Sequence, residues 1–458
     1  MTLRQWFYVT TFALLGVFVY ALYIDHFREW KPYQREYYRR MAAETRARME
    51  KAASPEEKQR LSNEVWSWDW RGLAIKQIIA RDLGRADRCV TCHVGMDEFT
   101  NPSLTNDFKE NPYKPHPDLS GLVKKHSFQK FGCVVCHGGQ GLATTVRGAH
   151  EGIEVHYGES HIASQYMLRP PFLQANCAKC HADLDKTRGA EVAAKGKALF
   201  EKHGCVGCHS INGVGGIISV DLGDIADKPP ERIAPHDFHL AKMPADRESI
   251  TVQNWILAHM TRDPMTFVRN DPEAKFNLEP IAPSGMPPYY KDFKEGDGEA
   301  IATWLLSHSH EEKIPREFYV YAAPKPEPKF ASAAEHGKFV FQKFGCAGCH
   351  GIDGKKGRRN FNGLAKTQKQ DASKPGDFEE MAKGEEPTLP DTMGTFTRDE
   401  LRVKIQNGVP PTSVAKFNPE GPTPPGFMPP WKEKVKGPEL EDLISYLQSI
   451  AKKEEGGW

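Results

Sequence analysis

The sequence has almost no net charge, because its 61 Lys and Arg residues are balanced by 60 Asp and Glu, which leaves a formal charge of +1. A chain without a basic excess gives no reason to expect nucleic-acid binding. Its mean hydropathy of −0.58 excludes a protein with many membrane spans but leaves room for one. Hydrophobic residues at 39% exclude a disordered polyelectrolyte, and 458 residues suggest roughly two to four domains.

No cysteine is left over: all ten occur as five Cys-x-x-Cys pairs, and a histidine directly follows every pair. This is the attachment motif of c-type haem, in which two thiols form thioethers to one haem and the histidine reaches its iron. Structural zinc, a disulfide framework and a redox-active dithiol are alternatives, but none of them requires a histidine after every pair. The sequence therefore predicts five covalently bound haem c groups, attached at Cys89, Cys92 and His93; Cys133, Cys136 and His137; Cys177, Cys180 and His181; Cys205, Cys208 and His209; and Cys346, Cys349 and His350.

The N-terminal segment Trp6 to Tyr23 carries no charge and is just long enough to span a bilayer as a helix. A cleaved signal peptide is the alternative, but the segment lacks an Ala-x-Ala-like cleavage site. We therefore expect a transmembrane signal anchor over residues 1–24. Basic residues after the segment favour a cytoplasmic body by the positive-inside rule, but haem c is attached outside the cytoplasm. We expect a single-pass protein of the bacterial inner membrane, with its haem domains in the periplasm or outside the cell.

Residues 25–80 are expected to form a helical stalk, in which Ser54-Pro-Glu-Glu starts the second helix with a capping box. Residues 81–188 contain three haem motifs, so the haems themselves must form most of the core of a trihaem module. Spare histidines are frequent there, and Met96 or Met167 is a less favoured alternative. The sequence predicts bis-histidine ligation, with His116, His126 and His150 as the candidate sixth ligands.

An internal repeat follows, because the fourteen residues that end at His209 match the fourteen that end at His350 at nine positions. Met-Pro-Pro begins 77 residues after His209, at Met286, and 78 residues after His350, at Met428. The repeat predicts two monohaem domains, residues 189–314 and 330–458, with Met286 and Met428 as axial ligands. A proline-rich linker over residues 315–329 joins them and predicts that the last domain moves. Other candidate ligands are Met243, Met260, Met265 and His239 in the first domain and Met381 and Met393 in the second.

Each repeat resembles a class I cytochrome c domain, with a helix leading into Cys-x-x-Cys-His, a Met-Pro loop and a closing helix with an aromatic-Leu pair. The front half resembles the membrane-anchored multihaem cytochromes c of bacterial respiratory chains, through Trp30-Lys-Pro-Tyr-Gln-Arg and Phe131-Gly-Cys-Val-Val-Cys-His-Gly-Gly-Gln-Gly. The resemblance implies a mainly α fold with extensive loops: a transmembrane helix, a haem-packed trihaem module and two all-α cytochrome c domains. It also implies a cytochrome b or Rieske-type quinol-oxidising membrane complex as partner.

Two functions are consistent with the motifs. The first is an electron-transfer subunit that carries electrons from the quinol-oxidising complex to a soluble or terminal acceptor. The alternative is a catalytic multihaem reductase or peroxidase, which needs an iron with an open coordination site. The chain contains enough His and Met residues to fill every site, which favours the electron carrier.

Overall fold

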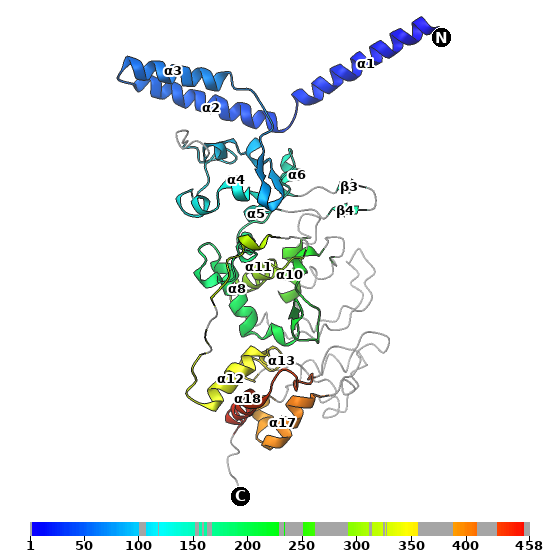
Figure 1. Cartoon of the computed structure of the whole chain (residues 1–458), viewed down its shortest axis with the longest axis vertical. Helices are drawn as coiled ribbons and strands as arrows, with labels where there is room; N and C mark the ends of the chain where they lie inside the picture. Colours follow the sequence, from blue (N-terminus) through cyan, green and yellow to red (C-terminus); the bar gives the residue numbers. More distant parts are fainter. Residues whose placement is uncertain are drawn as a thin grey trace. The chain divides into compact units, whose positions relative to one another are not determined.

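The structure is a computed structural model of the chain, drawn as a cartoon in Figure 1. The residues it describes are 2–99, 107–117, 119–151, 155–157, 160–162, 167–228, 233, 251–261, 292–310, 314–323, 326, 328–355, 388–409 and 428–452. The chain divides into two compact units, Met1–Arg169 and Pro170–Trp458. The third haem motif, which the sequence groups with the first two, lies in the second unit.

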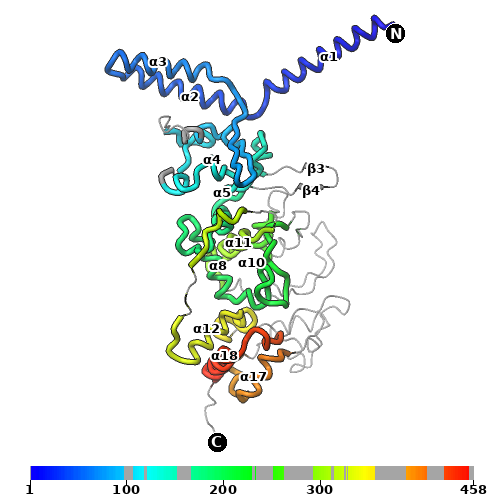
Figure 2. The backbone as a smooth tube through the Cα atoms, viewed as in Figure 1, coloured from blue at the N-terminus to red at the C-terminus, as the bar shows by residue number. Residues whose placement is uncertain are grey.

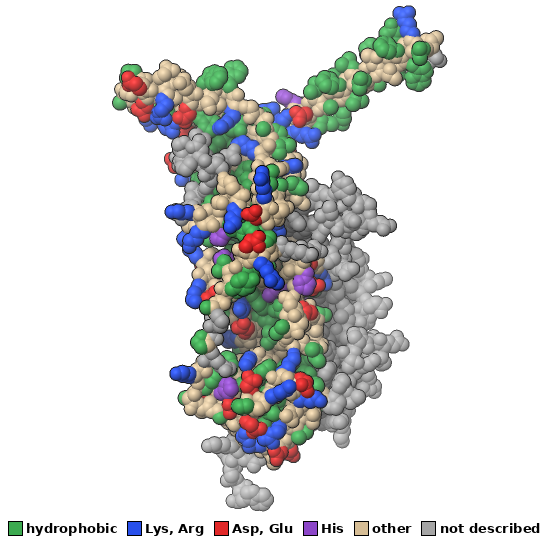
Figure 3. All heavy atoms as spheres, viewed as in Figure 1, with side chains coloured by type: hydrophobic (Ala, Val, Ile, Leu, Met, Phe, Trp, Pro, Cys, Tyr) green, Lys and Arg blue, Asp and Glu red, His purple; other side chains and the backbone are tan. Residues whose placement is uncertain are grey.

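Helix α1 (Leu3–His26) is formed by the apolar N-terminal segment, and a capping box between Thr2 and Gln5 starts it. None of its side chains is buried, and Figure 3 shows hydrophobic side chains along its whole length. Its 24 residues have a peak mean hydropathy of 1.9. At about 1.5 Å per residue the helix is roughly 36 Å long, which exceeds a hydrocarbon core of about 30 Å. The helix is therefore long and apolar enough to span a membrane, a property that a signal sequence shares.

Helices α2 (Trp30–Lys51) and α3 (Pro55–Asp69) pack side by side as a hairpin, visible in Figure 2. Ser54 accepts a hydrogen bond from the amide of Glu57, which is one of the two bonds of the predicted capping box, and Pro55 occupies the first turn. The hairpin is more than a stalk. Its aromatic side chains enter a buried cluster that also contains residues of the haem-motif region: Tyr37, Tyr38, Met41, Ala42, Trp68, Val94 and Tyr113.

Short elements make up the rest of the first unit. Strands β1 (Ile78–Ala80) and β2 (Arg85–Asp87) pair antiparallel, with Ile79 opposite Ala86. No helix in the described part of this region exceeds six residues. The remaining elements are η1 (Arg81–Leu83), η2 (Cys89–Thr91), η3 (Val94–Phe99), η4 (Leu119–Val123), α4 (Phe128–Phe131), α5 (Val134–His137), α6 (Val146–His150), β3 (Val155–Tyr157) and β4 (Ser160–Ile162).

In the second unit, the two repeats build the same pair of crossed helices. Helix α8 (Glu191–Lys202) packs on α11 (Asp297–Leu305), and α12 (Ala333–Lys343) packs on α18 (Gly437–Ser449). Glycine permits the close approach: a Cβ atom at Gly196 would lie 1.9 Å from the carbonyl oxygen of Ala300. The equivalent Gly337 would place its Cβ 1.8 Å from the carbonyl oxygen of Asp442. These two glycines are aligned in the repeat, so the repeated sequence encodes one helix crossing twice.

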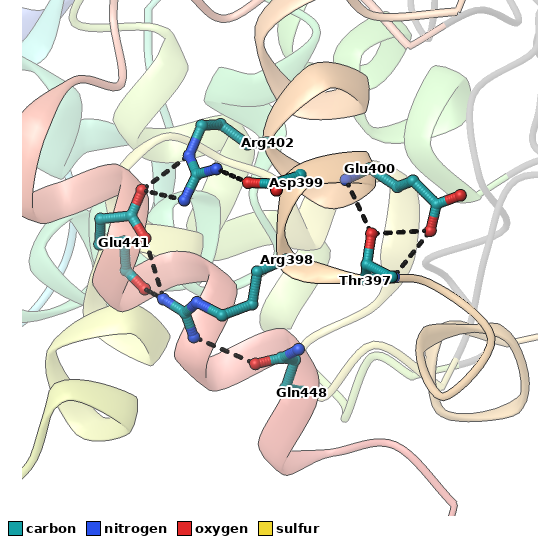
Figure 4. A network of polar contacts seen from close by, with 7 residues as sticks. All are labelled: Thr397, Arg398, Asp399, Glu400, Arg402, Glu441 and Gln448. Atoms are coloured by element: carbon teal, nitrogen blue, oxygen red, sulfur yellow. Dashed lines mark hydrogen bonds and ion pairs between the residues drawn. The ribbon is translucent and has the colours of Figure 1, made fainter.

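The last repeat has a continuous side-chain core. Val340, Phe341, Leu443 and Ile444 are almost fully buried where α12 crosses α18. Helix α17 (Arg398–Asn407) is joined to α18 by a polar network, shown in Figure 4. The carboxylate of Glu441 accepts hydrogen bonds from Arg398 and Arg402, both at 2.9 Å. The prediction of a mainly α fold is therefore confirmed.

The other elements of the second unit are short. They are η5 (Phe172–Gln174), α7 (Ala175–Ala178), η6 (Leu184–Lys186), η7 (Cys205–Gly207), β5 (Ser210–Ile211), β6 (Val214–Gly215), η8 (Ile225–Asp227), α10 (Val252–Thr261), η11 (Arg316–Phe318), α13 (Ala347–His350) and α16 (Leu389–Met393).

Candidate haem-attachment sites

All five Cys-x-x-Cys-His motifs adopt the same tight turn. In each, the amide of the second cysteine donates to the carbonyl of the first at 3.1–3.2 Å, and the histidine amide donates to the same carbonyl at 2.9–3.0 Å. Side chains three and four positions apart in such a turn lie on one side. The two thiols and the imidazole of every motif are thus presented together, at His93, His137, His181, His209 and His350.

The ten cysteines are free thiols, and none forms a disulfide. Burial raises the pKa of Cys205 and of Cys346 to about 12, so both stay protonated at neutral pH. Among the residues that the structure describes, no group of three or more His, Cys, Asp or Glu side chains is arranged to hold a metal ion.

Burial also favours the neutral form of four of the five motif histidines. Desolvation lowers the pKa of His93 and of His350 to about 4, and it lowers the pKa of His137 and His209 as well. The neutral imidazole is the form that binds a metal. Reduced thiol pairs beside neutral imidazoles fit a covalently attached haem.

The structure brings two of the three candidate sixth ligands close to motif histidines. The ring of His150 lies opposite that of His93, with centroids 6.2 Å apart and planes at 70°. The ring of His116 lies opposite that of His137, with centroids 6.1 Å apart and planes at 80°.

The third candidate, His126, has a different environment. Its Nδ1 donates to the carbonyl of Leu122 at 3.0 Å, because a carbonyl can only accept, and its ring lies 5.0 Å from that of Phe131. This tautomer places the lone pair on Nε2, as in histidines that bind metals through that nitrogen.

Buried polar and glycine contacts join the first two motifs. The amide of Cys133 donates to Asp87 Oδ2 at 2.7 Å, and the amide of Arg88 donates to the carbonyl of Gly141 at 2.7 Å. Asp87 is fully buried, and a Cβ at Gly132 would lie 1.9 Å from its Oδ2. Sequence analysis predicts no structural role for Asp87, although this residue opens the stretch Asp87-Arg-Cys-Val-Thr-Cys-His93, which resembles the multihaem cytochromes c. Apart from that stretch, its position two residues before a motif is its only signal there, because its partner is 46 residues away.

Comparison with known protein families decides the identity of the second unit. The family model for cytochrome c matches residues 193–309 and again residues 334–451, which together make up just over half of the chain. The chain belongs to the cytochrome c family. No curated protein and no solved structure matches it. The prediction of two C-terminal cytochrome c domains, which carry electrons by covalently bound haem, is thereby confirmed.

The first cytochrome c domain orients its motif histidine by a backbone contact. Nδ1 of His209 donates to the carbonyl of Val220 at 2.9 Å, which fixes the tautomer and leaves the lone pair on Nε2. The neighbouring residue Asp221 holds the loop that contains the Val220 carbonyl in place. Its carboxylate accepts hydrogen bonds from Ser210, Asn212, Gly213 and Gly223. These bonds lower the pKa of Asp221 well below its usual value. A charged, multiply bonded carboxylate thus supports the proximal side of the site.

The two predicted methionine ligands differ in what the structure describes. Met286 lies outside the described residues, as do Met243, Met265, His239 and Met381. Met428 is half-buried and packs against the core of the last cytochrome c domain, where its carbonyl accepts from the amide of Val409 at 2.7 Å. Met393, one of its rivals, is buried in the same core, and Met260 is half-buried in α10.

Proposed function

We propose that this cytochrome c is a membrane-anchored pentahaem electron carrier. It takes electrons from a quinol-oxidising membrane complex of the cytochrome b or Rieske type and passes them to a periplasmic or terminal acceptor. The observation that carries the proposal is the turn shared by all five motifs, two of which lie inside the cytochrome c domains. Because the same turn presents the same three side chains, it supports haem attachment at the other three motifs too.

The chain's residues divide the work between attachment and tuning. The ten motif cysteines attach the cofactors, and the five motif histidines supply one axial ligand each. Met286 and Met428 are proposed as the second ligands in the cytochrome c domains, and His116, His126 and His150 in the preceding module. Haem iron, when bound, accepts and releases one electron. Thioether ligands favour the reduced state more than imidazoles do, so electrons are expected to run toward the C-terminal domains.

Helix α1 supports anchoring at the membrane. Every one of its 24 residues is unburied in the chain's own fold, which fits a helix whose apolar surface is covered by lipid. The anchor would keep the haems close to a membrane complex that oxidises quinol. A retained N-terminus in the mature protein, established by sequencing it from isolated membranes, is the expected result; a mature chain beginning after His26 contradicts anchoring.

Haem number tests the core of the proposal. Mass spectrometry of the intact chain should show five covalently bound haems. Replacing Cys177 and Cys180 with Ala should remove one haem and leave four, because this motif lies outside the matched cytochrome c spans. A chain that carries two haems, or zinc instead of haem, contradicts the pentahaem assignment.

Electron transfer from quinol tests the physiological direction. In membranes that contain the chain and its partner complex, added quinol should reduce the c-type haem absorbance, and an inhibitor of the complex's quinol site should block the reduction. A carbon monoxide difference spectrum separates the enzyme alternative. The carrier should bind no carbon monoxide in its native reduced state, whereas a reductase or peroxidase with an open iron should bind it.

A further inference from the structure

The ring geometry of the first unit assigns two specific axial pairs. Resting on the proposed haem attachment, we propose that His150 is the ligand opposite His93, and that His116 is the ligand opposite His137. The sequence offers several histidines for these positions and does not pair them.

The separations match what one metal ion between two imidazoles requires. Metal–imidazole bonds are about 2.0–2.1 Å long, and atoms of a five-membered ring with bonds of about 1.33 Å lie roughly 1.1 Å from its centre. Two imidazoles on opposite sides of one metal therefore have centroids roughly 6.3 Å apart. The two pairs measure 6.2 Å and 6.1 Å.

Ordinary aromatic contact is the competing explanation, because ring pairs in proteins lie about 4.5–7 Å apart. Distance alone does not exclude this explanation, because the ring of His116 also lies 6.3 Å from that of Phe128 with planes at 70°. The two histidine pairs differ from such contacts because both of their rings can bind iron. Each pair also combines one motif histidine with one histidine from outside the motifs. By contrast, His126 packs on Phe131 at 5.0 Å, a typical direct ring contact.

The backbone holds His150 in place with contacts to both sides. It ends helix α6, which Thr145 starts by accepting from the amide of Gly148 at 3.2 Å. Its carbonyl accepts from the amide of Met167 at 2.8 Å, and the next amide, that of Leu168, donates to the carbonyl of His137 at 2.8 Å. The segment Met167-Leu168 is thus hydrogen-bonded both to His150, a proposed ligand of the first pair, and to His137, a proposed ligand of the second.

Glycine brings α6 close to the second motif. Gly139 has φ of +83°, and a Cβ there would lie 2.5 Å from the carbonyl oxygen of Ala149. His116 is held differently, since Pro115 and Pro117 flank it and restrict the backbone on both sides. Both candidate ligands therefore sit on stiff segments, as a preformed coordination site requires.

Electron paramagnetic resonance of the oxidised, full-length protein tests the assignment. Near-perpendicular imidazole planes give a strongly anisotropic low-spin ferric signal, whereas near-parallel planes give a rhombic one. The angles of 70° and 80° therefore predict two strongly anisotropic signals. His150→Met and His116→Met should each remove one of them, add a sulfur-to-iron charge-transfer band and raise the potential of one haem. The exposed-site variant His310→Met is the matched control and should change none of these.

A second pair of variants tests the same ligand pairing in case the Met variants misfold. His150→Ala and His116→Ala should each open one iron to carbon monoxide in the reduced protein, and added imidazole should restore a low-spin signal in the oxidised protein. If both anisotropic signals and all potentials survive the Met variants while five haems remain attached, the pairing is wrong. If mass spectrometry shows fewer than five haems in the unaltered protein, the proposed function fails instead, so the two failures are distinguishable.

An independent observation concerns the two cytochrome c domains, whose motif turns touch backbone to backbone. A Cβ at Gly207 would lie 2.1 Å from the carbonyl oxygen of Gly345, and a Cβ at Gly204 would lie 2.2 Å from the amide nitrogen of Gly348. The sulfur atoms of Cys208 and Cys349 are 3.7 Å apart.

We infer that the two domains are fixed against each other at their attachment turns. Their two haems would then form a pair with direct electron transfer between them. A side chain reinforces the contact, since Lys434 of the second domain donates to the carbonyl of Gly215 in the first. This arrangement replaces the expectation that the last domain moves on its proline-rich linker. Only glycine permits such an approach, because any side chain at Gly207 would overlap the opposite turn.

Magnetic coupling tests the pair in the unaltered protein. Two oxidised haems attached this close together should broaden each other's resonance signals. Gly207→Val should abolish that broadening and speed proteolysis within residues 315–329, whereas Gly72→Val, a change into open space, should do neither. Uncoupled spins in the unaltered protein overturn the inference, as does a Gly207→Val protein that keeps its coupling and its resistance to protease.

Discussion

The two units of the chain present the same motif turn in opposite settings. In the second unit, crossed helices and a side-chain core hold the last motif, with Phe341 and Ile444 almost fully buried beside it. In the first unit, short elements are tied by single polar contacts, such as that between Asp87 and the amide of Cys133. The difference teaches that the same turn is compatible with either scaffold. In the proposed function, the last domain supplies methionine as second ligand, whereas the first unit supplies histidines.

The largest effect should come from exchanging the ligand type. Met428→His should give the last cytochrome c domain the ligation proposed for the first unit and lower the potential of one haem. Different axial ligands set haem reduction potentials over a range of about 0.8 V. A change of 0.1 V in potential corresponds to about 2.3 kcal/mol per electron. A redox titration followed at the haem band measures the shift. Met393→Leu, a change in the same buried core, is the control and should leave the potential in place; a shift in the control alone would identify Met393 as the ligand.

The next effect concerns the helix crossing that only the second unit has. Gly337→Val would place side-chain atoms against the carbonyl of Asp442, where even a Cβ would lie at 1.8 Å. Overpacking of this kind typically costs about 1–3 kcal/mol, and occasionally more. Thermal unfolding of the full chain, followed at the haem band, should show one transition shifted down.

Gly394→Ala is the matched control for that crossing. Gly394 already has a helical φ of −66°, and the nearest atom to an added Cβ would be 3.5 Å away. The control should therefore unfold at the same temperature as the wild-type protein. A Gly337→Val protein whose transition is unshifted would mean that the crossing tolerates a side chain at Gly337.

How far the sequence could predict the molecule follows from the range of the interactions involved. The motif turns, the start of α3 at Ser54 and the helix pairs of the repeats depend on neighbouring residues or on a duplicated pattern, so the sequence alone identifies them. The placement of the His150 ring beside that of His93 could not be predicted, because the two residues are 57 positions apart and neither lies in a periodic segment. The role of Asp87 was invisible for the same reason.

A smaller loss of stability should show that the first unit depends on a buried polar contact, whereas the second unit depends on its apolar core. Asp87→Ala removes the acceptor for the buried amide of Cys133, and an unsatisfied buried donor costs about 1–3 kcal/mol. The first unit should unfold earlier while the cytochrome c domains keep their transition. Asp87→Asn, which retains a carbonyl acceptor, should recover most of the loss; an Ala variant as stable as the wild type contradicts the bracing role.

The contribution of Asp87 to the stability of the first unit should depend on pH. Burial raises the pKa of Asp87 above its usual value, despite the backbone hydrogen bonds that lower it. A raised pKa in the folded state contributes stability below the unfolded value of about 3.9, and this contribution is lost as pH rises through the folded pKa. The stability of Asp87→Asn relative to the wild type should therefore rise from about pH 4 toward neutrality. A constant difference across that range would mean that Asp87 ionises as freely in the folded protein as in the unfolded chain.

The smallest effect is expected at the surface network of the last domain, drawn in Figure 4. Hydrogen bonds from Arg402 and Arg398 lower the pKa of Glu441, so its contribution is present above the unfolded pKa and is lost as pH falls through the lowered value. Because the Glu441 side chain is 42% exposed, solvent screening limits the gain to at most about 1 kcal/mol. Glu441→Gln should therefore cost little at neutral pH in high salt, slightly more in low salt, and nothing in acid, where the wild-type carboxylate is itself protonated. Thermal midpoints of the C-terminal transition at two salt concentrations measure this directly. A loss that is independent of salt and persists in acid would show that Glu441 acts through packing between α17 and α18 rather than through its charge.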